Sequence, residues 1–309
     1  MKDITKITKP AIAKSPRKAK PKLLYEDNLQ HVQISKSLPK AFIEFHKPHF
    51  IKGVNHILKV DPSLYPVIVN ENFKHFENDE DNSIKSQVVV DETETIRKYW
   101  LSLISSIISQ QISGSAAKSI YGRFEALFKE SPNPKELLEM STEDLRAVGL
   151  SSMKVKYVID ISENFGNPEN PLTSIKFYQE SSLDEIVTEL VKLKGVGEWS
   201  AKMFALFTLK EWDVFAETDL GVARGASNYL SKRPELLKDI KQGISQHEDL
   251  VSMMKKKGKF SNGGSKRDWI AYHEAYYLYL SLKFAPYRSI LTLLFWRLSA
   301  TNVEVLEND

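Results

Sequence analysis

Apolar side chains recur at three- and four-residue spacing over much of the chain after residue 95. Ile96, Trp100, Leu103 and Ile107 follow this spacing, which places side chains on one face of an α-helix. The same spacing recurs in residues 117–127, 155–161 and 186–193. The pattern therefore predicts a series of short amphipathic helices.

Polar residues at the ends of these segments support the helix assignment. Ser141 with Asp144, and Ser182 with Glu185, have the spacing of a capping box at a helix start. Gly149 and Gly195 follow apolar runs, where glycine typically ends a helix. Residues 86–92 (SQVVVDE) are the best strand candidate and are short, so the sequence predicts an all-α fold.

The N-terminal third has a different pattern. Residues 1–38 are rich in Lys, Pro and Ser and are predicted to be mostly disordered. Residues 39–94 are expected to form a helix or two, interrupted at Pro48, followed by an acidic linker. The main helical domain is predicted over 95–300, with an internal loop at Pro168–Pro171 between two helical groups and a tail at 301–309.

Composition narrows the chemistry. The 309 residues include no cysteine, which excludes disulfides, thiolate nucleophiles and iron–sulfur clusters. No apolar run is long enough to span a membrane, and the lysine-rich start does not resemble a secretory signal. Lysines cluster in residues 1–22 and 253–269. Each cluster fits either contact with a polyanion or an ordinary solvated segment.

Residues 190–204 (LVKLKGVGEWSAKMF) predict a helix, a tight turn and a second helix. Gly195 and Gly197 permit a positive φ and a close approach of another backbone. The amides near Val196 and Gly197 would lie at the N-terminus of the second helix, where anions such as phosphate bind. A plain turn between two helices explains the same residues.

A carboxylate stands shortly after this hairpin, in WDVFAETDLGV (212–222). Thr218 is the expected N-cap of a new helix, with Asp219 in its first turn, where the helix dipole favours an anion. Asp213 and Glu217 lie in the same loop, and a first-turn acid is often only a cap. The residues alone leave the choice open.

These stretches together resemble the helix-hairpin-helix DNA glycosylases. The resemblance rests on the hairpin with its aspartate and on SSIISQQISGSAAKSI, LRAVGLSSMKVKYVIDIS and FAPYRSILTLLFWRL, which keep the family's order over residues 95–300. Within this superfamily the chain is most similar to the 3-methyladenine (alkylpurine) DNA glycosylases of yeast and of the bacterial inducible type. The family implies two helical subdomains with the active-site cleft between them.

The resemblance implies a role for each matched residue. It implies Asp219 as the catalytic carboxylate and Gln111 as the residue wedged into the duplex. The phosphate-binding turn would consist of Gly195, Val196 and Gly197. The base pocket would be lined by Trp199, Phe284 and Met203. Backbone carbonyls of Val191, Leu193 and Val196 would hold a structural monovalent cation, and no cofactor is implied for catalysis.

Some residues depart from the family's patterns or receive a structural interpretation. Trp199 stands where bifunctional relatives have a Schiff-base lysine, so strand cleavage is not expected. Some bacterial members have aromatics in place of Met203 and Leu220. We interpret Trp296 as scaffold and expect Arg288 to bond the hairpin or nearby backbone.

The implied function is monofunctional excision of 3-methyladenine and 7-methylguanine from double-stranded DNA in the nucleus, by a monomer with no membrane contact. Two alternatives remain at this stage. One is a glycosylase of the same fold for another lesion, such as uracil. The other is a helix-hairpin-helix protein that only binds DNA.

Overall fold

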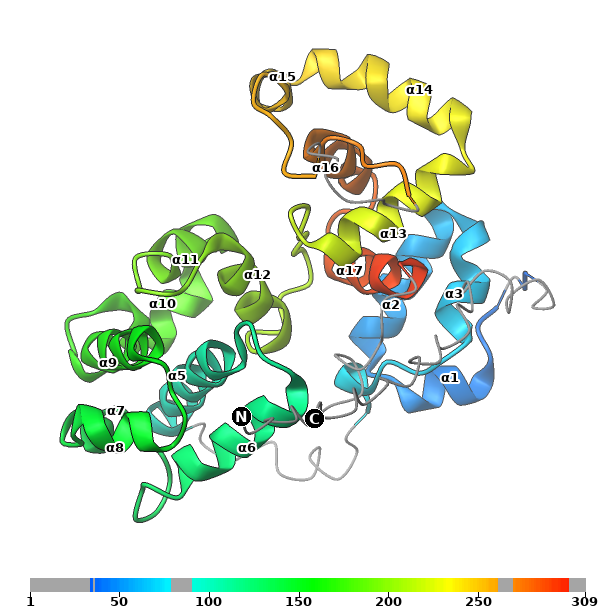
Figure 1. Cartoon of the computed structure of the whole chain (residues 1–309). Coiled ribbons are helices and arrows are strands. Elements are labelled where there is room, and N and C mark those ends of the chain that lie inside the picture. Colours follow the sequence, from blue (N-terminus) through cyan, green and yellow to red (C-terminus); the bar gives the residue numbers. More distant parts are fainter. Residues whose placement is uncertain (1–33, 36, 79–90, 261–268, 300–309) are drawn as a thin grey trace, which may run out of the picture.

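The computed structural model describes residues 34–35, 37–78, 91–260 and 269–299 (Figure 1). Within these ranges every regular element is a helix, and the only β-type pairing is an isolated bridge between His46 and Glu77. The predicted all-α class is therefore confirmed for the described residues. Among these residues, no helix combines the length and hydrophobicity that a membrane crossing needs.

The helices form two groups, each around its own apolar core, which we call lobe I and lobe II (Figure 1). The core of lobe I is built from residues 100–204, in one continuous stretch of chain. Its helices are α5 (Glu92–Ser109), α6 (Gly114–Glu125), α7 (Pro134–Leu138), α8 (Thr142–Ala147), α9 (Ser152–Gly166), α10 (Ile175–Glu180), α11 (Leu183–Leu190) and most of α12 (Glu198–Phe207).

Lobe II combines the two ends of the described chain. Its C-terminal helices are α13 (Leu220–Ser231), α14 (Pro234–Gly243), α15 (Glu248–Met254), α16 (Glu274–Leu282) and α17 (Arg288–Leu298). Helix α17 is buried along most of its length and crosses α13 closely. Gly225 permits this crossing, because a Cβ there would lie 1.8 Å from the carbonyl oxygen of Phe295.

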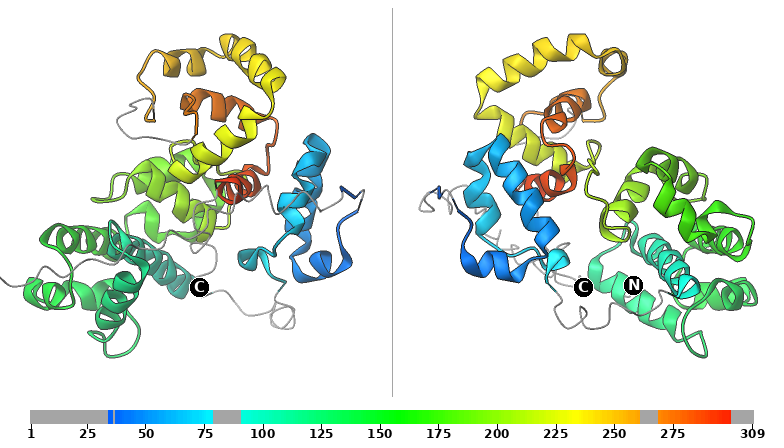
Figure 2. Two further views of the ribbon diagram at one scale, coloured as in Figure 1. Left: turned by 45° about the vertical axis from the view of Figure 1, so that its right-hand side comes forward. Right: turned by 180° about the vertical axis from the view of Figure 1, so that it is seen from behind.

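The N-terminal segment belongs to lobe II. Its helices are α1 (Lys40–Phe45), α2 (Pro48–Val60) and α3 (Tyr65–Val69). Of these, α2 and α3 contact α17, and Figure 2 shows the N-terminal helices on the α17 side of the molecule. Pro48 begins α2, as expected from the interruption predicted there. Phe73 and Phe76, which we assigned to an acidic linker, are buried in the same core. Residues 39–76 therefore complete the helical fold rather than precede it.

Arg297 of α17 fixes this packing. Its guanidinium is 1% exposed and donates to the carbonyls of Val67 and Ile68 at 3.0 and 3.1 Å. It also donates to the carbonyls of Glu71 and Asn72, at 3.0 and 3.1 Å. One buried side chain thus pairs the backbone acceptors at the end of α3, which would otherwise be unsatisfied.

Several local predictions can be compared with the structure. Ser182 and Glu185 form a complete capping box at the start of α11, and Ser141 caps α8, as predicted. The loop at Pro168–Pro171 was expected to separate two helical groups, but it lies within lobe I, because Leu172 just after it packs in that core. The strand candidate 86–92 lies outside the described residues except for Asp91 and Glu92, which begin α5.

Candidate active site

The predicted hairpin is present between α11 and α12. Helix α11 ends at Leu190, and a short turn through Gly195 leads to the start of α12 at Glu198. Gly195 has a φ of +84°, and a Cβ there would lie 2.4 Å from Cδ2 of Tyr157. The backbone at this position therefore requires glycine, both for its dihedral angle and for the contact with α9.

Gly197 serves the turn in another way. Its φ is −94°, so Gly197 does not use the positive φ that glycine permits; the residue is extended and is the N-cap of α12. A Cβ on Gly197 would meet no atom within 4 Å, and the residue is exposed. The first amides of α12 thus face open space, which is the environment that a bound phosphate requires.

Asp219 is held by three N–H groups from three parts of the chain. Its Oδ1 accepts from the backbone of Val222 at 2.9 Å and from the indole of Trp296 at 2.7 Å. Its Oδ2 accepts from the indole of Trp199 at 2.8 Å. Asp219 is itself the N-cap of α13, so the prediction of Thr218 as the cap is wrong.

The two tryptophans connect the lobes at this carboxylate. Trp199 comes from the first turn of α12 and is 42% exposed, while Trp296 comes from α17 and stacks on Phe207 with ring centroids 5.8 Å apart. Trp296 was interpreted as scaffold, and its direct bond to Asp219 corrects that interpretation. Sequence reasoning missed it because the two residues lie 77 positions apart.

The rival carboxylates of this loop are paired with cations. Asp213 accepts from the guanidinium of Arg288 at 2.7 and 2.8 Å, which raises the pKa of Arg288. We expected Arg288 to bond the hairpin or nearby backbone, but its guanidinium bonds the side chain of Asp213 instead. Glu217 is buried and accepts from Nζ of Lys202 at 2.8 and 2.9 Å. Within the described part of the chain, Asp219 alone of the three forms no ion pair.

Gln111 lies in the loop between α5 and α6. Its side chain is exposed and its φ is +59°, an unusual value for a residue other than glycine. The preceding Gln110 donates from Nε2 to the carbonyl of Gly195 at 3.0 Å. Lys154 of α9 donates to the carbonyls of Ile108 and Gln110 at 2.6 and 2.8 Å. The loop that carries Gln111 is thus bonded directly to the hairpin turn.

The other two predicted pocket residues have different environments. Phe284 is 1% exposed in the core of lobe II, so its predicted position against an extruded base is wrong for this structure. A large apolar ring at the end of a helix fits a core as readily as a pocket, which is why its type was ambiguous. Met203 is half-buried on α12 and packs against the same core.

The predicted cation ligands are backbone carbonyls of the hairpin turn. Leu193 and Val196 are buried and Val191 is exposed, and the carbonyl of Leu193 accepts from the amide of Val196 at 3.1 Å. A carbonyl has a second lone pair, so this hydrogen bond leaves room for a metal ion. The described residues contain no group of His, Cys, Asp and Glu side chains that could hold a metal.

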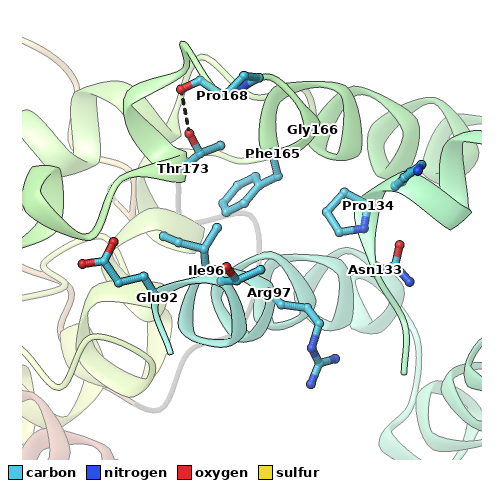
Figure 3. Close-up of a pocket in the computed structure, with 11 residues that line it drawn as sticks. Glu92, Ile96, Arg97, Asn133, Pro134, Phe165, Gly166, Pro168 and Thr173 are labelled. Carbon is cyan, nitrogen blue, oxygen red and sulfur yellow. Dashed lines mark hydrogen bonds between the residues drawn. The ribbon is translucent and has the colours of Figure 1, made fainter. Parts of the chain in front are cut away.

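A pocket of about 480 Å³ opens elsewhere on lobe I (Figure 3). The side chains of Ile96, Phe165 and Pro134 line it, and Thr173 at its rim donates to the carbonyl of Pro168. None of the predicted site residues lines this pocket. It therefore plays no part in the site around Asp219.

Comparison with known proteins identifies the family. Residues 104–244 match the HhH-GPD superfamily of base excision DNA repair proteins. The chain is 35% identical to the DNA-3-methyladenine glycosylase of Saccharomyces cerevisiae over 277 residues, which cover 87% of this chain and 86% of the yeast protein. The chain belongs to the HhH-GPD superfamily. It is a DNA glycosylase of base excision repair. The family resemblance and the helix-hairpin-helix motif inferred from the sequence are therefore confirmed.

Other relatives of this DNA glycosylase are more distant. DNA-3-methyladenine glycosylase 1 of Schizosaccharomyces pombe is 28% identical over 152 residues, which cover 48% of this chain and 64% of that protein. The solved DNA-3-methyladenine glycosidase of Bacillus halodurans is 25% identical with a TM-score of 0.48, and the likeness covers 74% of this chain and 94% of that one. The solved S. pombe 3-methyladenine DNA glycosylase, in complex with abasic DNA, is 23% identical with a TM-score of 0.47, and the likeness covers 66% of this chain and 82% of that one.

Proposed function

We propose that this DNA glycosylase removes 3-methyladenine and 7-methylguanine from double-stranded DNA by hydrolysis of the N-glycosidic bond. The products are the free base and an abasic site. The identity to the yeast DNA-3-methyladenine glycosylase supports the substrate class. The observation that carries the proposal is Asp219, whose carboxylate is oriented by two indoles and one backbone amide.

The reaction requires stabilisation of positive charge. Purines alkylated at N3 or N7 are cationic and leave readily, so the chemistry needs no strong general acid. Cleavage of the bond to the sugar builds oxocarbenium character, as in glycoside hydrolysis. A fixed carboxylate at Asp219 stabilises that charge without reorganisation, and it can also orient the attacking water.

The base must first leave the stack, because the duplex shields its glycosidic bond. Extrusion costs a few kcal/mol. Gln111, exposed in its loop, fills the gap, and the turn through Gly195, Val196 and Gly197 holds a phosphate of the strand. The amide of Val196 already donates to the carbonyl of Leu193, so the phosphate contact is made by the amides from Gly197 onward. Trp199, whose ring is exposed, stacks on the cationic base, an attraction of roughly 0.5 to 2 kcal/mol.

Trp199 also bears on the fate of the DNA strand after excision. Its indole occupies the position from which a lysine would form an imine with the sugar, and its N–H is bonded to Asp219. The nearest lysine along α12 is Lys202, whose ammonium is bonded to Glu217 and Glu198. We therefore propose a monofunctional enzyme that leaves the DNA strand intact.

The deciding experiment measures release of 3-methyladenine and 7-methylguanine from alkylated duplex DNA by the wild type and by Asp219→Asn under single-turnover conditions. The variant keeps the shape of the side chain and removes its charge. We expect excision to fall by at least about 100-fold, with binding to an abasic-site duplex retained. Binding without release by either protein would sink the enzymatic proposal, and release of uracil instead of alkylated purines would redirect it to another lesion.

Three further properties belong to this proposal. The carbonyls of Val191, Leu193 and Val196 hold a monovalent cation, testable by comparing thermal stability in potassium and in a large organic cation. The protein acts as a monomer, testable by sedimentation with and without DNA. The lysines of residues 1–22 address it to the nucleus, testable by fusing this segment to a fluorescent protein.

A further inference from the structure

The second lysine cluster of the sequence comes after α15 as the segment Lys255–Phe260, which holds Lys255, Lys256, Lys257 and Lys259. The segment is anchored to lobe II. Phe260 is 6% exposed in the core of that lobe, and Gly258 is buried. Nε2 of His273 lies 3.1 Å from the carbonyl oxygen of Lys256. These contacts give the lysines a defined place on the surface.

That place is beside the catalytic loop. Nζ of Lys259 donates to the carbonyl oxygen of Thr218 at 2.8 Å, across 41 positions of sequence. Thr218 immediately precedes Asp219, the carboxylate that Trp199 and Trp296 hold. The basic segment therefore contacts the residue next to the proposed reaction centre.

The remaining lysines stay close to this point. Because a chain extends by at most about 3.6 Å per residue, Lys255 lies within about 14 Å of Lys259. Lys255, Lys256 and Lys257 are exposed, and none of them forms an ion pair within the described residues.

Unpaired surface ammonium groups are strongly hydrated and do little for stability, but they bind polyphosphates well. Each Lys that neutralises a phosphate releases condensed counterions from DNA, which favours binding. Lobe I offers its amides to the strand at the hairpin, and the basic segment projects from lobe II. Asp219 is bonded to both lobes through Trp199 and Trp296, so the two surfaces meet at the carboxylate.

We propose that Lys255–Phe260 is a second DNA-backbone element, which binds phosphates near the nucleotide that enters the site. Phe260 and Lys259 anchor it, and Lys255, Lys256 and Lys257 contact the phosphates. The element positions the strand without reading sequence, since phosphate contacts carry no base information. This inference rests on the proposed function for the identity of its partner, and it adds a surface that the hairpin alone does not provide.

The test compares the salt dependence of DNA binding. The variant Lys255→Gln/Lys256→Gln/Lys257→Gln removes three charges and keeps side-chain length. The matched control Lys135→Gln/Lys238→Gln/Lys241→Gln removes three exposed charges from α7 and α14. The probe is a labelled duplex with a tetrahydrofuran abasic-site analogue, titrated by fluorescence anisotropy at several KCl concentrations. Circular dichroism establishes that both variants are folded.

The slope of log Kd against log salt should fall by about 1 for each lysine that contacts a phosphate, and so by about 2 to 3 in the test variant. The control variant should keep the wild-type slope. An unchanged slope in the test variant, or an equal loss in both variants, would overturn the proposal. Excision of alkylated purines is measured on the same proteins. If the wild type excises bases and the test variant keeps the wild-type slope, the basic segment does not contact DNA, but the enzymatic function stands. If the test variant loses slope and the wild type excises no base, the basic segment contacts DNA, but the proposed enzymatic function is wrong.

Discussion

At the scale of single residues, the site depends on how little freedom Asp219 has. Both of its oxygens accept N–H groups, and two of the donors are rigid indoles. A carboxylate fixed in this way needs no rearrangement when charge develops on a sugar nearby. The orientation of the carboxylate is thus a property of Trp199 and Trp296 as much as of Asp219.

Trp296→Phe tests this dependence. Phenylalanine keeps an aromatic ring to stack on Phe207 and removes the N–H that bonds Asp219. Loss of one hydrogen bond to a charged group costs about 1.5 to 3 kcal/mol, so the single-turnover excision rate should fall about 10- to 100-fold. Binding to an abasic-site duplex should change little.

Trp100→Phe is the matched control for that variant, because it removes an indole N–H bonded to Ser162 in the core of lobe I. It should lower the free energy of unfolding and leave the excision rate of the folded protein near that of the wild type. Equal excision rates for Trp296→Phe and the wild type would show that the second indole does not position the carboxylate.

His46 makes the stability of lobe II depend on pH. Its Nδ1 donates to the carbonyl of Phe42 at 2.7 Å, and its Nε2 accepts from the amide of Phe73 at 2.9 Å, so the ring is neutral. Burial lowers the pKa of His46 below its ordinary value of 6.5; the bond to Phe42 opposes this shift, and Arg297 adds to it.

The unfolded chain binds a proton at His46 more readily than the folded chain does. The contribution of His46 to the free energy of unfolding is therefore fully present above about pH 6.5, and it is lost as the pH falls toward the lower pKa of the folded ring. Urea unfolding at several values between about pH 7 and pH 5 measures this loss. A His46→Gln variant, which has no titrating ring, should be less stable at neutral pH and should show a smaller decrease. Parallel decreases in the two proteins would contradict the assignment.

Residue types alone could not separate the members of this site. Asp213, Glu217 and Asp219 share one loop, and only their partners distinguish them: Arg288, Lys202 and the two indoles. Arg288, Lys202 and Trp296 lie 75, 15 and 77 positions away from their carboxylates. A motif shared with a family singled out Asp219, whereas the bond from Trp296 and the burial of Phe284 are consequences of tertiary packing that no local pattern carries.

At the scale of elements, the two glycines of the hairpin have different roles. Gly195 is required by the fold, because its φ is positive and the ring of Tyr157 fills the space where a side chain would stand. Gly197 is not required by the fold, because its backbone is extended and its surroundings are open. Two identical substitutions should therefore have different effects.

Gly195→Ala should lower the free energy of unfolding by about 2 to 4 kcal/mol, from the left-handed backbone together with the overlap with Tyr157. Gly197→Ala should change stability by less than about 1 kcal/mol and weaken DNA binding, because the new methyl group stands where a phosphate approaches the amides of α12. Chemical denaturation and anisotropy with an abasic-site duplex measure the two effects. If Gly197→Ala binds DNA as the wild type does, the hairpin amides do not hold the strand.

Two of the predicted helix starts, at Ser141 and Ser182, are confirmed. Ser141 and Ser182 cap their helices through bonds to residues three positions away, so a short window of sequence contains the whole interaction. The loop at Pro168–Pro171 shows the limit of such windows. Its prolines correctly marked a break between helices, but only the burial of Leu172 reveals that both sides pack in the same core.

At the scale of the whole molecule, lobe II is closed by two distant parts of the chain. Residues 39–76 pack on α17, and Arg297 bonds four carbonyls between Val67 and Asn72. The guanidinium also lies 3.4 Å from the ring centroid of Phe73. Separating this segment from the glycosylase domain at residue 95, as the sequence suggested, would remove part of the core beneath α17.

Arg297→Met measures the strength of this closure. The variant keeps an unbranched side chain and leaves buried carbonyls without donors, so the free energy of unfolding should fall by at least about 3 kcal/mol. Arg233→Met is the control, because Arg233 is partly exposed, lies over the ring of Tyr229 and forms an ion pair with Asp61 at 3.6 Å instead of donating to several buried carbonyls of the N-terminal segment. The loss of the Arg233 side chain should lower the free energy of unfolding by about 1 kcal/mol or less. Similar stabilities for the two variants would show that Arg297 does not close the lobe.

The distance between Asn72 and Arg297 along the chain also sets an order of events during synthesis. The two residues are 225 positions apart. At a translation rate of about 5 to 20 residues per second, the first helices leave the ribosome roughly 10 to 45 s before their partner exists. Lobe I, a continuous stretch, can fold during this interval. The apolar faces of α2 and α3 lack their partner until α17 emerges, and exposed apolar surface of this kind makes a nascent chain prone to aggregation.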